Sequence, residues 1–225
     1  MLERLKLLIS NENIDKIKNS KIIIIGIGGV GGSCLEGLVR TGFENITIVD
    51  NDIIDESNLN RQIITNSHNI GQYKCDIAEK RAKDINPNIN ITKKIQFIDE
   101  TNITDLKLEN YDYIIDTQDT TNTKILLIKE SIRLNKKIIS SMGTGNRIDP
   151  SKLTITNIWK TNNDPLAKKI RNLLRKERIT AKIPVISSTE LPIKTNSKTV
   201  GSTAFVPNSA GLLIASYIFQ NTIKK

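Results

Sequence analysis

A run of β-branched residues that ends abruptly in glycines constrains the fold of this chain more than any other stretch. The segment from Lys21 to Gly31 reads KIIIIGIGGVG, which is typical of a buried parallel strand followed by a tight turn. The glycines have the spacing G-x-G-x-x-G. Gly26 suits the turn, Gly28 lets the backbone approach a phosphate closely, and Gly31 lets the next helix pack on the strand.

The residues that follow complete a β-α-β pattern. A helix is expected from about Gly29 to Thr41, with its free N–H groups directed at a bound anion. A second strand, Ile46 to Val49, ends at Asp50, where an acidic residue can reach ribose hydroxyls. A glycine turn without a ligand is the alternative. Because strand, glycines, helix, strand and acid occur in register, the pattern favours a nucleotide site.

Strands and helices alternate along the chain. Strands are expected near 21–25, 46–49, 91–97, 112–116 and 137–141, and helices near 29–41, 74–84 and 122–135. This alternation predicts an α/β fold, a Rossmann-like doubly wound and mostly parallel sheet with C-terminal antiparallel strands and flanking helices. The 225 residues suit one domain. We expect a helical arm (1–20), a nucleotide-binding core (21–141) and a part for substrate and dimer contacts (142–225).

The last third of the chain has a different character. Residues 153–159 alternate apolar and polar, as in a half-exposed antiparallel strand. Asp164 and Pro165 suit the start of a helix, and an apolar helix is expected near 208–223. Residues 191–200 are rich in turn-forming and polar types and are expected to form a mobile loop.

The charge balance and the cysteines limit the classes of function that the chain can have. With 33 Lys and Arg against 24 Asp and Glu, the net charge of +9 suits a polyanionic partner, although a compositional drift towards lysine could contribute. Cys34 and Cys75 form no C-x-x-C motif, so we expect no zinc site of that type and no disulfide framework. The chain shows no signal peptide and no apolar stretch long enough for a membrane span, so we expect a cytoplasmic protein without membrane contacts.

The segment after Asp50 separates two uses of the same motif. A dinucleotide dehydrogenase has no use for an arginine and a glutamine about ten residues beyond the ribose-binding acid. A triphosphate-binding enzyme can use both residues, because Arg61 provides a planar, permanently charged fork for phosphate oxygens. Asn58 and Gln62 can add neutral hydrogen bonds, and Lys74 can add a point charge.

Two acids, Asp116 and Asp119, end the strand expected at 112–116. A carboxylate at this end of a sheet strand, beside a phosphate site, is well placed to hold Mg²⁺. Asp116 can instead cap the next helix, so Asp119 is the candidate metal ligand. Asp52 is either a nucleotide ligand or a turn residue in an acidic loop.

These motifs resemble the ThiF-like adenylating superfamily, which includes the ubiquitin-activating enzymes. The resemblance is carried by Gly26-x-Gly-Gly-Val-Gly31, Asp50-x-Asp52, Ser57-Asn-Leu-Asn-Arg-Gln62, Lys74, Ile85-Asn-Pro87 and Asp116-x-x-Asp119. It implies ATP-dependent activation of a carboxylate, with release of pyrophosphate and formation of an acyl-adenylate.

The resemblance also implies roles for single residues. Asp50 would bind ribose, Asn58, Arg61 and Lys74 would hold the phosphates, and Asp119 would bind magnesium. Arg4 matches an arginine that in related dimers reaches the triphosphate of the neighbouring subunit, which implies a homodimer. One departure is that Lys124 stands where an arginine is often found, and it can supply charge but no bidentate fork.

The second half is similar to one subgroup, the tRNA threonylcarbamoyladenosine dehydratases. The similarity is carried by Ser140–Pro150, Asp164–Arg171, Gly201-Ser and Phe205-Val-Pro. It implies adenylation of a threonyl carboxylate on a modified adenosine in tRNA, followed by ring closure within the same group. Residues 142–225 would then contact the tRNA. No cysteine follows Cys75, and intramolecular cyclisation needs no enzyme thiol.

The helix expected from Asp164 is the candidate tRNA contact. An apolar stripe (Leu166, Ile170, Leu173 and Leu174) would face the core, and the other face would carry Lys168, Lys169, Arg171 and Arg175. Such a face can also be merely solvated. Arg147 could contact the substrate or pair with Asp149, and His68 is expected in a solvated turn.

Three other functions remain open at this stage. The chain could adenylate the C-terminal glycine of a ubiquitin-like sulfur carrier, with a sulfur-relay protein as a possible partner. It could be a non-catalytic nucleotide-binding module, although Arg61, Lys74 and Asp119 argue against this. A hydride-transferring dehydrogenase is the most distant alternative.

Overall fold

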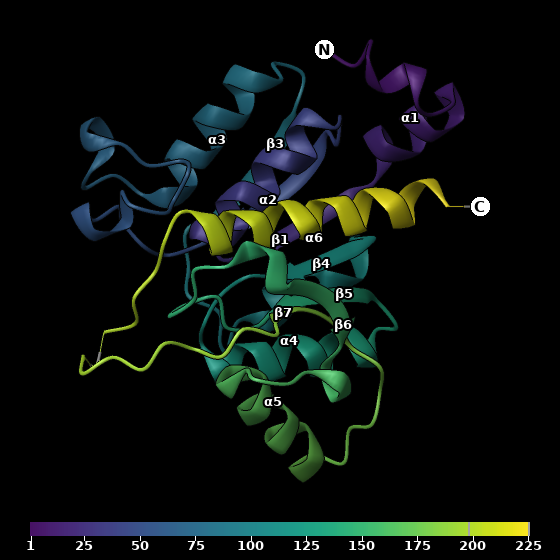
Figure 1. Ribbon diagram of the computed structural model, residues 1–225. Coiled ribbons are helices and arrows are strands. Elements are labelled where there is room, and N and C mark those ends of the chain that lie inside the picture. Colours follow the sequence, from purple (N-terminus) through teal and green to yellow (C-terminus); the bar gives the residue numbers. More distant parts are fainter. Residues whose placement is uncertain (198, 225) are drawn as a thin grey trace.

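The computed structural model, described here for residues 1–197 and 199–224, contains one seven-stranded sheet with the strand order β3-β2-β1-β4-β5-β7-β6 (Figure 1). The strands are β1 Lys21–Ile25, β2 Asn45–Val49, β3 Asn90–Lys94, β4 Tyr113–Asp116, β5 Lys137–Ser141, β6 Leu153–Asn157 and β7 Pro184–Ser188. Of these seven strands, β6 runs antiparallel to its neighbour and the others run parallel. The predicted doubly wound α/β fold is confirmed.

The helices are α1 Asn11–Asn19, α2 Gly29–Arg40, α3 Lys74–Ile85, α4 Thr121–Arg133, α5 Pro165–Lys176 and α6 Phe205–Ile223. Short 3-10 turns include Leu5–Leu7 in the N-terminal arm. α5 begins as predicted, because the Asp164 side chain accepts a hydrogen bond from the Ala167 N–H and Pro165 occupies the first turn. No helix among the described residues is both long and apolar enough to cross a membrane.

β7 was not predicted from the sequence, and it is the main addition to the expected fold. The strand runs parallel to β5, with Ser140 opposite Val185, and antiparallel to β6, so β6 and β7 form the antiparallel pair at the C-terminal side of the sheet. β7 is short and starts with a proline. The first position of a strand tolerates proline, but a short run without alternation carries no clear strand signal.

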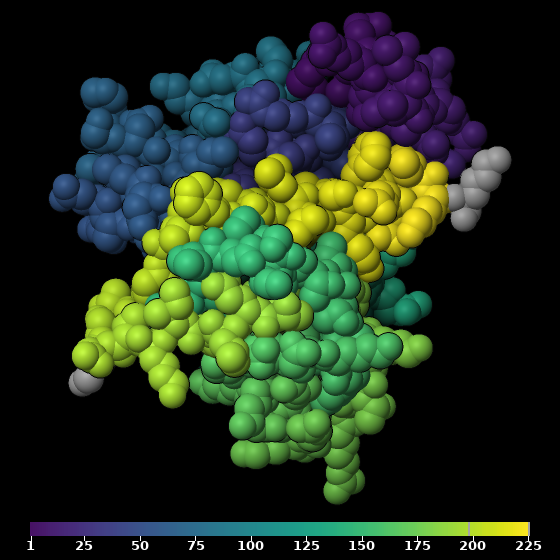
Figure 2. All heavy atoms as spheres, viewed as in Figure 1, coloured from purple at the N-terminus to yellow at the C-terminus, as the bar shows by residue number. Residues whose placement is uncertain are grey.

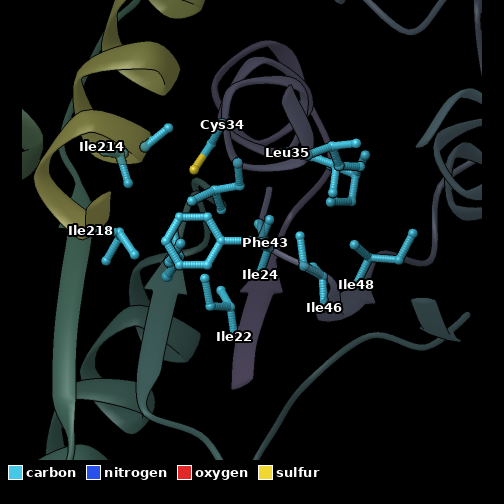
Figure 3. Packing of buried hydrophobic residues seen from close by; sticks show 14 of the residues in the cluster. Ile22, Ile24, Cys34, Leu35, Phe43, Ile46, Ile48, Ile214 and Ile218 are labelled. Atoms are coloured by element: carbon cyan, nitrogen blue, oxygen red, sulfur yellow. The ribbon is translucent and has the colours of Figure 1, made fainter. Parts of the chain in front are cut away.

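The two faces of the sheet are set by the alternation of side chains along β1. Ile22 and Ile24 pack with α2, α6 and the central ring of Phe43 (Figure 3). Ile23 and Ile25 face the other way, into the cluster that α4 and α5 cover. Because both sets are buried, β1 reads as an uninterrupted apolar run.

The C-terminal helix α6 completes the layer over the first half of the chain. It packs closely on α2 at Gly211, where a Cβ would overlap the Val30 carbonyl oxygen. The Ser33 hydroxyl and the Asn208 amide oxygen also form a hydrogen bond between these helices. Figure 2 shows α6 lying across the surface between residues from the first half and residues from 140 onwards. The two halves of the chain therefore share one core.

Candidate active site

A cavity of about 240 Å³ opens at the carboxyl ends of β1, β2, β3 and β4. Its lining residues are Ile25, Gly26, Val49, Asp50, Asn51, Asp52, Gln96, Phe97, Ile98, Gln118, Asp119 and Thr120. Four predicted site residues, Gly26, Asp50, Asp52 and Asp119, are brought together here. Ligands of doubly wound sheets bind at this edge, because parallel strands all end there and leave a crevice.

The glycine loop has the geometry that the motif predicts. Gly26 adopts a positive φ of +96°, which L side chains rarely adopt, and its N–H donates to the Val49 carbonyl at 2.8 Å. A Cβ on Gly31 would overlap the Gly26 carbonyl oxygen, so the glycine lets α2 pack on the strand end. The space over Gly28 is open as far as Gln62 Nε2, 4.0 Å from a hypothetical Cβ. A phosphate contact there stays a prediction.

Asp50 is held in place by two backbone N–H groups. Its Oδ2 accepts from the Ile27 N–H at 2.6 Å, and its Oδ1 accepts from the Asp52 N–H at 2.8 Å. Burial raises the pKa of the Asp50 carboxyl above its ordinary value, and the nearby Lys74 ammonium partly opposes that shift. The carboxylate is thus fixed at the mouth of the cavity, and its lone pairs can accept from further donors.

Lys74 pairs with Asp52, one of the acids that line the cavity. The side chain is 7% exposed, and its Nζ lies 2.6 Å from Asp52 Oδ2. The Lys74 N–H also donates to the Asp52 carbonyl at 3.0 Å. Asp52 is 56% exposed, so this pair joins the start of α3 to the open side of the cavity.

The predicted phosphate-binding segment forms a turn beside the glycine loop. The Arg61 carbonyl lies 3.3 Å from a hypothetical Cβ on Gly29, so this turn and the start of α2 are neighbours. Arg61 Nη1 donates to the Ser57 carbonyl at 2.7 Å and to Asn60 Oδ1 at 3.0 Å. The Nε and Nη2 atoms of Arg61 have no hydrogen bond to described residues. Asn58 is buried and accepts from the Asp55 N–H, so it shapes the turn. Gln62 is also buried, and its Oε1 has no partner within the described chain.

The two acids after β4 have separate environments. Asp119 is exposed and lines the cavity. Asp116 is completely buried and pairs with Lys124, whose Nζ lies 3.0 Å from Asp116 Oδ2 and 2.7 Å from the Ser141 carbonyl. The expectation that Lys124 supplies charge to the nucleotide is therefore not supported, because its ammonium is used inside the protein.

Several cavity residues were not predicted from the sequence, among them Gln96, Phe97 and Gln118. Gln96 and Phe97 follow β3, which ends at Lys94 and not near 97 as predicted. Gln118 lies between the two acids. The buried Nε2 atoms of Gln96 and Gln118 have no hydrogen-bond partner in the described part of the chain. The position of these residues directly after strand ends was the available signal.

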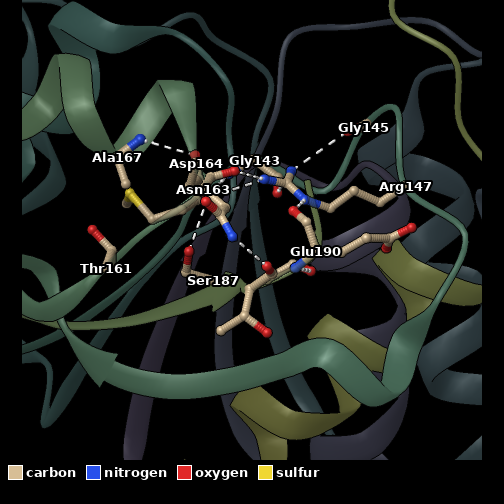
Figure 4. A network of polar contacts seen from close by, with 12 residues as sticks. Gly143, Gly145, Arg147, Thr161, Asn163, Asp164, Ala167, Ser187 and Glu190 are labelled. Carbon is tan, nitrogen blue, oxygen red and sulfur yellow. Dashed lines mark hydrogen bonds and ion pairs between the residues drawn. The ribbon is translucent and has the colours of Figure 1, made fainter. Parts of the chain in front are cut away.

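Arg147 requires a correction. It is 2% exposed, and it donates to the carbonyls of Asn163 at 2.9 Å and Glu190 at 3.2 Å (Figure 4). Its Nη2 also lies 4.0 Å from Asp164 Oδ2. The predicted nucleic-acid contact and the pairing with Asp149 are therefore not supported. Arg147 instead holds the loop after β5, because its Nη1 donates to the Gly143 carbonyl.

The basic face of α5 is only partly as predicted. Lys168, Lys169 and Arg175 are exposed, whereas the Arg171 guanidinium is half-buried and donates to the Thr161 hydroxyl. Arg171 therefore serves the packing of α5 and is less available to a partner. In the apolar stripe, Leu173 is only half-buried and Ala167 is fully buried.

Arg4 lies away from this cavity. It is exposed in the arm, where the neighbouring Leu2 contacts Gly42 just beyond the end of α2. That position is at the amino edge of the sheet, because α2 runs from the glycine loop to the start of β2. Arg4 therefore does not join the site of its own chain. Figure 1 shows the arm with α1, beyond the far end of α2.

The two cysteines and His68 do not line the cavity. Cys34 and Cys75 are both buried, and burial raises the pKa of both thiols, that of Cys75 to about 12. His68 is exposed in a 3-10 turn. Within the described residues, no group of three or more His, Cys, Asp or Glu side chains is arranged to hold a metal ion.

Known proteins share the sequence pattern of this chain. The ThiF family pattern matches residues 2–163. The chain is 37% identical to the tRNA threonylcarbamoyladenosine dehydratase of Bacillus subtilis, over 98% of this chain and 94% of that protein. It is 38% identical to the adenylyltransferase and sulfurtransferase UBA4 of Vanderwaltozyma polyspora, over 63% of this chain and 32% of that protein.

The fold also matches a solved structure closely. The E. coli tRNA N6-threonylcarbamoyladenosine dehydratase TcdA, in complex with AMP, superposes with a TM-score of 0.91. The match covers 96% of this chain and 91% of the TcdA chain, with 29% sequence identity. The same enzyme has been solved with ATP.

Proposed function

This chain belongs to the ThiF family, and from that premise we propose that it is an ATP-dependent tRNA threonylcarbamoyladenosine dehydratase. It adenylates the threonyl carboxylate of N6-threonylcarbamoyladenosine in tRNA and promotes ring closure, which is a net loss of water. One observation carries the proposal, namely the similarity to the Bacillus subtilis dehydratase over almost the full length of both proteins. We expect the protein to act in the cytoplasm, where its RNA substrate would be found.

The cavity suits ATP, which is a substrate of the proposed reaction. Asp50 would accept hydrogen bonds from ribose hydroxyls, and Phe97 and Ile98 offer an apolar wall for the base. The unpartnered Nε2 atoms of Gln96 and Gln118 are donors that a bound nucleotide would satisfy. On the adjoining side, Lys74 and Arg61 would hold the phosphates above the open backbone at Gly28.

Magnesium is the metal that the family implies. Asp119 is an exposed carboxylate on the cavity wall, with no hydrogen bond to the described residues, and it suits Mg²⁺, which prefers oxygen ligands. A single carboxylate is a sufficient protein contribution, because the ion takes its other ligands from phosphates and water. Bound Mg²⁺ would neutralise charge on the phosphates and favour the departure of pyrophosphate.

The protein contributes mainly position and charge to the two steps. In the first, a carboxylate oxygen of the substrate attacks the α-phosphorus and pyrophosphate leaves. Lys74 and Arg61 would stabilise the charge that builds on the phosphates. In the second, a group of the same side chain attacks the activated acyl carbon and AMP leaves. This step needs a held geometry and no enzyme nucleophile, which agrees with the burial of both thiols.

A homodimer would explain the position of Arg4. The arm lies at the amino edge of the sheet and the nucleotide cavity lies at the carboxyl edge, so an arm could reach the phosphates only from a second subunit. We propose that Arg4 acts across such a dimer. Mixing an Arg4→Ala protein with an Asp119→Ala protein should then restore part of the activity, because one site of each heterodimer would be intact.

The test of the function is mass spectrometry of tRNA nucleosides after incubation with the protein and ATP. The threonylcarbamoyl nucleoside should lose the mass of one water, and AMP and pyrophosphate should appear in equal amounts. AMP formation that depends on a sulfur-carrier protein and ignores tRNA would favour the second candidate, adenylation of a carrier C-terminus. Similarity to UBA4 supports that candidate, but the buried thiols offer no acceptor for a thioester.

A further inference from the structure

A groove at the C-terminal end of α5 lies outside the candidate active site. Its volume is about 390 Å³, and its lining residues are Trp159, Arg175, Arg178, Ile179 and Thr180, none of which is acidic. α5 begins at Pro165, and its N-cap Asp164 lies beside the loop after β5. Because an α-helix rises about 1.5 Å per residue, Arg175 lies roughly 16 Å along the axis from Asp164.

The walls of the groove are held by the fold. Trp159 Nε1 donates to the Ala181 carbonyl at 2.9 Å, which fixes the plane of the indole. Arg178 has a positive φ of +56°, and its N–H donates to the Arg175 carbonyl at 3.0 Å. The Ile179 N–H donates to the Leu174 carbonyl at 2.9 Å. The groove therefore exists before a ligand binds, and binding would not need to order its backbone.

The chemistry of the groove is an aromatic face beside unneutralised positive charge. The Arg175 guanidinium lies over the Trp159 ring, 5.6 Å from its centre. Glu177, the one acid near this helix end in sequence, is paired at 2.8 Å with Lys129 on α4. Arginine beside an aromatic ring is the combination that holds single-stranded nucleic acid, because the ring stacks a base and the guanidinium binds its phosphate.

We propose that this groove binds an unpaired nucleotide of the RNA that carries the reacting nucleoside. The base takes the place of the Arg175 guanidinium over the Trp159 ring, and Arg175 and Arg178 then contact the adjoining phosphates. Lys168 and Lys169 are exposed on the same helix, between the groove and the active-site end, and they contact the backbone in between. The identity of the RNA rests on the function proposed above, whereas binding at the groove does not require that reaction.

The protein carries its own reporter for this site, because Trp159 is its only tryptophan. Indole fluorescence should be quenched in a saturable way by a tRNA transcript and by a short unpaired oligoribonucleotide. Duplex RNA of the same length should quench much less. RNA that binds, as seen by anisotropy of a labelled transcript, without changing the indole fluorescence would overturn the proposal.

Variants separate stacking from charge. By anisotropy, Trp159→Ala should weaken binding of the oligoribonucleotide roughly 5- to 100-fold, and Trp159→Phe, which keeps a ring, should weaken it less. Arg178→Ala should weaken binding and lower the salt dependence. The matched control is Arg40→Ala, an exposed arginine at the end of α2 on the opposite face. Equal affinities for Trp159→Ala, Arg178→Ala and Arg40→Ala would also overturn the proposal.

The two proposals can fail separately. If nucleoside dehydration proceeds normally in Trp159→Ala, at all tRNA concentrations, the groove is not a substrate contact and the reaction stands. If unpaired RNA quenches Trp159 but no water is lost from the nucleoside, the groove stands and the reaction fails.

Discussion

Lys124 and Asp116 form an ion pair in which both side chains are 0% exposed, with 3.0 Å between Nζ and Oδ2. The Lys124 ammonium also donates to the Ser141 carbonyl, and the Ser140 hydroxyl donates to Asp116 Oδ2 at 2.5 Å. The pair therefore connects α4 to the carboxyl ends of β4 and β5. Those strand ends carry Asp119 and the loop after β5, so the pair lies directly under the candidate active site.

Removing one member of this pair should be costly. Lys124→Met leaves a buried, unpaired carboxylate and should lower the free energy of unfolding by about 3–5 kcal/mol. Lys129→Met is the matched control, because Lys129 lies on the same helix as Lys124 and forms an exposed pair with Glu177. This variant should lower the free energy of unfolding by about 1 kcal/mol or less. Urea denaturation of both variants measures the difference. Similar values would show that the buried pair contributes no more than a surface pair.

Asp119 should matter for chemistry and not for folding. Asp119→Asn removes an exposed carboxylate without disturbing the core, so we expect AMP formation to fall by at least about 100-fold. The melting temperature should stay within experimental error of the wild type. The control is Asp15→Asn, a carboxylate in α1 away from the cavity. AMP release near the wild-type rate in Asp119→Asn would contradict the assignment of the metal ligand.

The raised pKa of Asp50 predicts how nucleotide binding depends on pH. A ribose hydroxyl donates to the ionised carboxylate, so binding requires the charged form. Because burial raises the pKa of Asp50 above 3.8, affinity should be constant above that raised pKa and should fall as the pH is lowered through it. An ordinary aspartate would lose affinity only at lower pH.

Calorimetric titration of ATP at several acidic pH values would measure this dependence. Because the phosphates titrate as well, the comparison is with Asp50→Asn, which should bind more weakly and lack the contribution of Asp50. Parallel pH profiles for the two proteins would mean that Asp50 does not contact the ribose.

The exposed lysines of α5 should act through charge alone. Reversing Lys168 and Lys169 to glutamate should weaken binding of tRNA and reduce the slope of log affinity against log salt by about 0.7–0.9 for each phosphate that the protein no longer neutralises. Lys80→Glu with Lys83→Glu, on α3 across the sheet, is the control with the same change of charge. Unchanged affinity at low salt would identify the basic face of α5 as merely solvated.

The sequence by itself determined the architecture around the nucleotide site. The isoleucines of β1, the turn at Gly26 and the start of α2 follow from local rules, because a strand buried on both faces must be apolar and a positive φ favours glycine. The same local patterns placed Asp50 at the end of β2 and Asp119 after β4. The cavity confirms that these two acids face one space.

The tertiary structure alone decided which charged and polar side chains are available to a ligand. From the sequence, Arg147 and Lys124 could each offer a positive charge to a ligand. In the structure both are buried: Arg147 donates to the Glu190 carbonyl, and Lys124 donates to the Ser141 carbonyl at the end of β5. The tertiary structure also places Arg4 at the opposite edge of the sheet. β7 is recognisable as a strand only from its pairing with β5. The environment of a charge depends on what packs against it, and those neighbours come from remote parts of the chain that no local pattern specifies.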